Sequence, residues 1–278
     1  MSLCFRFLYY FLIKKSKKII FLNEGFLQLT CFNKKNKKFF IKTLLGVVGN
    51  EKRYVISVPD DHAVVFSEMI HGDITRPECE RLFRHICTKN NMESSSTWTA
   101  YHCLKFNRKT FFSVVNIGEH MFNQVGWDEF NIKKLIHVDI PVFSILRFFM
   151  FTEQFRENMV LVSVQENAMA IYGFVESAWA SQSKVHGPFK HGITVGLQEL
   201  IDQSHVLSQS SHDQVVYLLT SNQMKGCEES LSEMLQSAVT PVSIWDYVDD
   251  SVSDFDRDMV DKYPLQMLIV MGMSLWRP

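Results

Sequence analysis

The chain has 278 residues, of which 46% are hydrophobic and 13% aromatic, and its formal net charge is −1. This apolar content is enough to bury one large core or two smaller ones, which excludes a disordered protein. The charge is unevenly distributed: residues 1–42 hold ten Lys or Arg and one acidic residue, which leaves 19 basic (29 − 10) and 29 acidic (30 − 1) residues for the rest. The amino end should therefore be attracted to anionic surfaces.

The amino terminus combines an apolar run, Leu3 to Ile13, with a lysine cluster that follows it at once. As a helix this run reaches about 16 Å, too short to span a bilayer, and it lacks the charge order and cleavage site of a signal peptide. We expect residues 1–18 to form a separate segment that attaches peripherally to an anionic membrane and can be removed without unfolding the rest. An edge strand packed on the domain, or an upstream start codon, is the alternative. The expected contact residues are Phe5, Leu8, Phe11, Lys14, Lys15, Lys17 and Lys18.

Two stretches, residues 19–42 and 159–185, share the pattern of a strand, a polar break and a return strand. The breaks are Asn23-Glu24-Gly25 and Gln165-Glu166-Asn167. Each hairpin opens a half-chain of mixed strands and helices, which predicts an internally duplicated α/β protein. A nucleotide can lie between the halves of such a fold.

The segments between the hairpins carry local signals of helices and strands. Thr75 and Glu78 form a capping box before an apolar helical pattern, and two runs at 54–58 and 63–70 predict a further hairpin. Further helices are predicted at 118–125, 139–151, 197–207, 227–235 and 265–276, and further strands at 98–106, 110–117, 215–219 and 242–245. Because no Pro/Gly linker interrupts them, we expect one bilobal body with lobes at 19–155 and 156–278.

Six cysteines without a regular spacing favour reduced thiols in a cytosolic compartment. The group of Cys79, His85, Cys87, His102 and Cys103 suggests zinc, but positions 79, 85 and 87 do not share a helix face, so no metal site is expected. The glycine-containing loop at 186–192 is a weak candidate for anion binding. The chain has no P-loop, GxGxxG or GxSxG motif.

The order of these elements, ending in the apolar segment Tyr263 to Arg277, resembles the actin-like cytoplasmic subunits of type IV pilus and type II secretion platforms, the PilM, MshI, BfpC and GspL group. The resemblance covers about residues 19–277. It implies a duplicated actin-like (ribonuclease H-like) α/β fold with two mixed-sheet lobes.

The chain departs from active members of this group where they bind nucleotide. They carry Asp-x-Gly at the first break and a Gly-Gly pair after the late strand, where this chain has Asn23-Glu24-Gly25 and Ser221-Asn222. Glycines let the backbone approach the phosphates, and the carboxylate holds the water shell of the metal. We therefore expect no cofactor, no metal and no enzymatic activity. The carboxylates that could rebuild a metal site are those of Glu24, Glu166 and Glu199.

The resemblance then implies a non-catalytic scaffold on the cytoplasmic face of the bacterial inner membrane, which links the pilus assembly ATPase to membrane platform proteins. The alternative is a nucleotide-binding actin-like ATPase or a sugar-kinase-like enzyme. Nucleic-acid binding through the basic end is disfavoured, because the acidic remainder of the chain offers no continuous basic groove.

Residues 246–261 contain seven Asp and a single basic residue, Arg257, with aromatic residues between them. One interpretation is a solvated surface loop whose aromatic side chains pack on the body. The other is an electrostatic docking strip for a basic partner domain, such as the assembly ATPase. The residues expected to contact the partner are Asp249, Asp250, Asp254 and Asp256.

Overall fold

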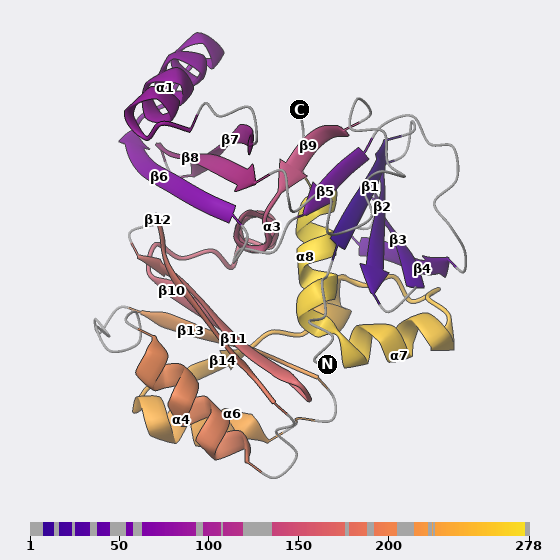
Figure 1. Cartoon of the computed structure of the whole chain (residues 1–278). Helices are drawn as coiled ribbons and strands as arrows, with labels where there is room; N and C mark the ends of the chain where they lie inside the picture. Colours follow the sequence, from indigo (N-terminus) through magenta and orange to yellow (C-terminus); the bar gives the residue numbers. More distant parts are fainter. Residues whose placement is uncertain are drawn as a thin grey trace. The chain divides into compact units, whose positions relative to one another are not determined.

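The computed structural model divides the chain into two compact units (Figure 1). Unit 1 holds Met1–Lys34, Phe39–Phe151 and Ile269–Pro278, and unit 2 holds Lys35–Lys38 and Thr152–Leu268. The main division at 151/152 falls near the predicted one at 155/156. The structure describes residues 8–13, 17–23, 26–33, 38–44, 54–57, 63–92, 97–106, 108–118, 135–175, 178–187, 192–204, 214–221, 224 and 226–275.

Unit 2 contains a five-stranded sheet in the order β12-β11-β10-β13-β14. The strands β10 (Met159–Gln165), β11 (Ala168–Val175) and β12 (Ala178–His186) are antiparallel neighbours. β13 (Val215–Thr220) and β14 (Val239–Pro241) extend the sheet in parallel from β10. The predicted second hairpin is confirmed.

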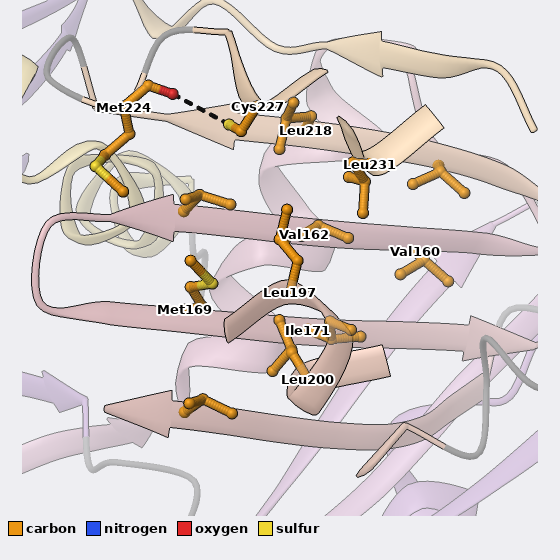
Figure 2. Packing of buried hydrophobic residues seen from close by; sticks show 13 residues of the cluster. Val160, Val162, Met169, Ile171, Leu197, Leu200, Leu218, Met224, Cys227 and Leu231 are labelled. Carbon is orange, nitrogen blue, oxygen red and sulfur yellow. Dashed lines mark hydrogen bonds between the residues drawn. The ribbon is translucent and has the colours of Figure 1, made fainter. Parts of the chain in front are cut away.

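Alternate residues of the central strands build the core of unit 2, because side chains in a strand point to opposite faces of the sheet. Val160, Val162 and Val164 of β10 pack with Leu197 and Leu231 (Figure 2). Those two leucines belong to α4 (Ile193–Gln203) and α6 (Cys227–Leu235), which pack on the same face. Every residue of β10 is buried, which explains why its sequence does not alternate between apolar and polar residues.

The end of unit 2 is helical. A short 3₁₀ helix, η5 (Ile244–Tyr247), stands where the sequence predicted a strand at 242–245, and that prediction is wrong. The preceding strand, β14, ends at Pro241, and the Val242 N–H still donates to the Leu218 carbonyl of β13 at 2.8 Å before the chain turns into η5. The next helices are α7 (Asp254–Lys262), capped by the Ser253 hydroxyl, and α8 (Pro264–Ser274), which continues into unit 1.

Unit 1 contains a six-stranded sheet in the order β4-β3-β2-β1-β5-β9. The predicted first hairpin is confirmed as antiparallel β2 and β3. β1 lies between β2 and β5 and is antiparallel to both, whereas the corresponding strands of unit 2, β10 and β13, pair directly. The bounds are β1 (Leu8–Ile13), β2 (Lys17–Asn23), β3 (Phe26–Asn33), β4 (Lys38–Leu44), β5 (Tyr54–Ser57) and β9 (Leu135–Asp139).

This arrangement differs from the separate segment predicted for residues 1–18. Leu8–Ile13 is hydrogen-bonded along both edges, and Lys17 and Lys18 begin the next strand. A strand in the middle of a sheet has its backbone groups satisfied on both sides, which ties it to the domain. Among the described residues, no helix is long and apolar enough to cross a bilayer.

A smaller antiparallel sheet of unit 1, in the order β6-β8-β7, comes between β5 and β9 in the sequence. Its strands are β6 (Ala63–His71), β7 (Thr97–Phe106) and β8 (Lys109–Gly118). The predicted hairpin of 54–58 with 63–70 is wrong, because β5 and β6 belong to different sheets. Helix α1 (Arg76–Lys89) packs on β8 through Cys79, Ile86 and Cys87.

The capping box at the start of α1 is confirmed. The Glu78 carboxylate accepts hydrogen bonds from the Thr75 N–H and hydroxyl, both at 2.6 Å. These bonds lower the pKa of Glu78. The last helix of this part, α3 (Pro141–Phe151), follows β9, and its residues 141–149 are all buried.

Candidate functional site

The turn of the second hairpin lies at the carboxyl end of β10. Gln165 pairs with Ala168, so Glu166 and Asn167 form a two-residue turn. Ser221 follows β13 directly, and its N–H donates to the Val164 carbonyl at 3.1 Å. Because β10 and β13 are parallel, their carboxyl ends meet at one edge of the sheet, where open α/β sheets bind ligands.

The side chains buried at this edge are polar but neutral. The Gln165 amide nitrogen donates to the Gln266 side-chain oxygen at 3.0 Å, and both side chains are buried. Ser163 and Ser221 are buried as well, and their hydroxyls have no hydrogen-bond partner within the described part of the chain. Glu166 is half-buried in the turn. The strand ends therefore offer hydrogen bonds without a buried charge.

This arrangement can orient a hydrogen-bonding ligand, because amides and hydroxyls both donate and accept. Its described residues include no fully buried carboxylate for the oxygen ligation that Mg²⁺ prefers. Across the residues that the structure describes, no three His, Cys, Asp or Glu side chains gather closely enough to hold a metal ion. Of the cysteine and histidine group considered above, Cys79 and Cys103 lie together, with 3.9 Å between their sulfur atoms.

Several predicted site residues lie outside the described residues: Phe5, Lys14, Lys15, Glu24, Gly25, Asn222 and most of the loop at 186–192. Asn23 ends β2, where it pairs with Phe26 across the turn. Leu8 and Phe11 lie in β1, and Lys17 and Lys18 lie in β2. The membrane contact and the chemistry of the first turn remain predictions.

The acidic segment places its carboxylates in different surroundings. Asp249 accepts from the Ser251 N–H at 3.0 Å and from its hydroxyl at 2.6 Å. Asp256 is 5% exposed and accepts from the hydroxyl of the cap residue Ser253. Asp250 is largely exposed and forms an ion pair with Lys38 at 3.4 Å, and Asp254 is exposed. Two of the four expected contact residues thus shape the local backbone, and the other two face solvent.

In the described part of the chain, the guanidinium of Arg257 contacts backbone carbonyls and a ring and forms no ion pair with the carboxylates of α7. Its guanidinium donates to the Asp250 backbone carbonyl at 2.9 Å and lies over the Trp245 ring at 5.6 Å from the centroid. Asp254 and Asp258 are exposed one turn apart on α7, and Phe255 beside them is 50% exposed. We call Asp254 and Asp258 the acidic face of α7.

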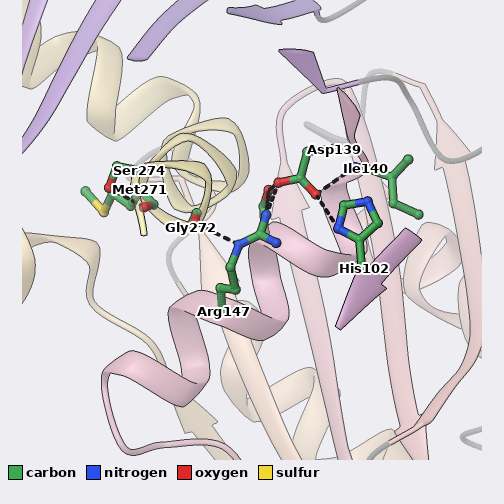
Figure 3. A network of polar contacts seen from close by, with 8 residues as sticks. His102, Asp139, Ile140, Arg147, Met271, Gly272 and Ser274 are labelled. Atoms are coloured by element: carbon green, nitrogen blue, oxygen red, sulfur yellow. Dashed lines mark hydrogen bonds and ion pairs between the residues drawn. The ribbon is translucent and has the colours of Figure 1, made fainter. Parts of the chain in front are cut away.

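Unit 1 contains a buried ionic network that was not predicted from the sequence (Figure 3). Asp139, at the end of β9, is 0% exposed and pairs with the Arg147 guanidinium of α3. It also accepts from the Ser144 hydroxyl at 2.8 Å and the Ile140 N–H at 2.9 Å. His102 of β7 lies 4.0 Å from the same carboxylate. A single charged residue, Arg147, in the otherwise uncharged segment 141–151 was the available signal, since a buried charge requires a partner.

The same network fixes α8 within unit 1. Arg147 Nε donates to the Gly272 carbonyl at 3.2 Å. Burial lowers the pKa of Arg147 to about 9, which still leaves it protonated at neutral pH. A Cβ on Gly272 would lie 1.8 Å from the Ser144 carbonyl oxygen, so only glycine permits this approach of the two helices. The network therefore holds structure in place rather than presenting a reactive group.

No family model and no curated protein sequence matches the chain. Its structure is similar to a chain of a PilM-PilN type IV pilus biogenesis complex, with a TM-score of 0.55 and 11% identity over 90% of this chain and 95% of that one. A Bacteroides thetaiotaomicron protein of actin-like ATPase fold and unknown function has a TM-score of 0.43 with this chain and 13% identity, over 88% of this chain and 93% of that one. The cytoplasmic domain of EpsL, from the type II secretion system of Vibrio cholerae, gives 0.40, with 8% identity over 92% of each chain.

The PilM likeness concerns the fold and covers nearly the whole of both chains. Together with the strand order of the two larger sheets, it confirms the predicted actin-like α/β fold.

Proposed function

We propose that this chain is a non-catalytic scaffold of the inner-membrane platform that assembles a type IV pilus, and that it acts on the cytoplasmic face. The main support is the similarity of its fold to the PilM chain over 90% of its length. The neutral side chains at the ends of β10 and β13 support the absence of catalysis. Within this proposal, the chain would correspond to the biosynthesis protein D of the toxin-coregulated pilus, which its size and its Lys-, Asn- and Phe-rich amino end resemble.

The scaffold would join two kinds of partner. The solved PilM chain is part of a complex with PilN, and we propose a membrane platform protein of that kind as one partner of this chain. The assembly ATPase would be the other partner. The basic amino end would add peripheral contact with the anionic membrane surface.

The direct test is a tagged copy of the chain expressed from its own locus. We expect a PilN-like membrane protein and the assembly ATPase to co-purify with it, and cells that lack the chain to lose surface pili. Complementation with the intact gene is the control. Normal piliation without the chain would overturn the proposal.

The alternative, an actin-like ATPase or sugar-kinase-like enzyme, keeps support from the fold and from the polar strand ends, which retain donors for a ligand. A steady-state hydrolysis assay with ATP, Mg²⁺ and the purified protein separates the two functions. The scaffold predicts a rate that equals the buffer blank. ATP hydrolysis that is lost in the Glu166→Ala variant would establish that the chain is an enzyme.

A further inference from the structure

Helix α1 exposes a basic face. Its apolar side is buried in the core, where Cys79, Ile86 and Cys87 pack on the small sheet. Arg81, Arg84, His85 and Lys89 are exposed on the rest of the helix, and we call these four residues the basic face of α1.

The acidic residues of α1 do not cancel this charge. The Glu78 carboxylate is held by Thr75, and Glu80 pairs with Arg76 at 3.3 Å. Arg81 lies near the carboxylate of Glu78. Because the apolar side of α1 is packed in the core, the helix has no free apolar stripe to insert into lipid, which favours a protein partner over a membrane.

A surface of complementary charge exists on the same chain. The acidic face of α7, Asp254 and Asp258, presents two carboxylates one helical turn apart, about 6 Å along the axis. Arg81 and Arg84, three residues apart, are likewise neighbours on the surface of α1. The half-exposed Phe255 gives the acidic side an apolar contact, and Arg257 is directed to backbone carbonyls.

We propose that the basic face of α1 in one copy of the chain docks on the acidic face of α7 in a second copy. Complementary charge speeds encounter and fixes orientation, while each exposed pair contributes little. The contact is therefore weak, reversible and sensitive to salt. Two different surfaces meet in it, so the contact is heterologous and can repeat from copy to copy. It requires no pilus partner, and its failure would leave the proposed scaffold role untouched.

Sedimentation velocity of the purified full-length chain tests the proposal. At low ionic strength, species larger than the monomer should grow with protein concentration. They should dissociate in about 1 M salt, where the screening length is about 3 Å. The pair Arg81→Glu with Arg84→Glu, and the pair Asp254→Lys with Asp258→Lys, should each abolish association. The variant that carries all four changes should regain it, because the charges are exchanged across the contact.

Two matched controls reverse exposed charges elsewhere. Arg108→Glu, in the turn before β8, and Glu233→Lys, on α6, should leave association unchanged. Thermal unfolding verifies that every variant is folded. Monomers at all concentrations, association that survives both reversals, or no recovery in the fourfold variant would each overturn the proposal. If the wild type is monomeric and the α1 reversal instead removes binding to phosphatidylserine vesicles, the face binds membranes and the proposal fails.

Discussion

The Asp139 carboxylate lies in the interior of unit 1, where its ion pair with Arg147 stabilises the buried charge. The change Asp139→Asn keeps the volume but leaves the Arg147 charge buried without its partner. Breaking a buried pair on one side typically costs about 3–5 kcal/mol. We expect a loss of that size in the free energy of unfolding, measured by urea titration. The double variant Asp139→Asn with Arg147→Met should lose less stability than Asp139→Asn alone, and a loss equal to the sum of the two single losses would show that the charges are independent.

Gly272 gives a steric test of the same region. The Cβ of Gly272→Ala would collide with the Ser144 backbone, which cannot rotate away as a side chain can. Overpacking of this kind costs about 1–3 kcal/mol. Gly192→Ala is the comparison, because a Cβ there meets no atom within 4 Å and should have a clearly smaller effect. A melting temperature unchanged by Gly272→Ala would mean that α3 and α8 can separate freely.

The acidic residues near α7 should respond differently to substitution. Asp256→Ala removes a buried acceptor that pairs with the cap residue Ser253, and losing such a cap interaction costs about 1 kcal/mol. Asp254→Ala removes only an exposed charge, which should leave stability almost unchanged. Thermal unfolding of both variants checks this order. The reverse order would mean that α7 is capped in another way.

Among the elements, β1 differs most from the prediction, because it lies inside the six-stranded sheet rather than in a separate segment. Deleting residues 2–13 removes a strand that pairs with both β2 and β5, so we expect the large sheet of unit 1 to lose its order. The five-stranded sheet of unit 2 has its own core and should keep its protection. Hydrogen exchange resolved by peptide measures both. If hydrogen-exchange protection in β2 and β5 is unchanged, residues 1–18 form a separate segment, as the sequence predicted.

Local signals predicted some elements and failed for others. The hairpins β2–β3 and β10–β11 could be predicted because a polar break separates each pair of apolar runs. The capping box marked the start of α1 in the same way. The partner of β5 and the place of β1 could not be predicted, because both depend on pairing with strands that the local sequence does not specify.

The candidate sites divide in the same way. The turn at Gln165 followed from the pattern of its hairpin, but its partner Gln266 is 101 residues away. Arg147 and Gly272 are 125 residues apart, and neither residue alone indicates the contact. The apolar run of 265–276 predicted the helix but not the reason for its glycine. Contacts of this range appear only once the helices and sheets are packed.

For the whole molecule, the neutral strand ends predict that nucleotide does not change the melting temperature. A ligand that binds only the native state at 100 times its Kd stabilises it by about 2.7 kcal/mol, which raises the melting temperature measurably. With Gln165 paired to Gln266 and no buried carboxylate beside them, millimolar ATP with Mg²⁺ should produce no shift. The control is the same titration with EDTA, which should give an identical curve. A magnesium-dependent rise that Glu166→Ala abolishes would mean that the half-buried turn carboxylate holds the metal, and the scaffold would then have to work as a nucleotide-dependent one.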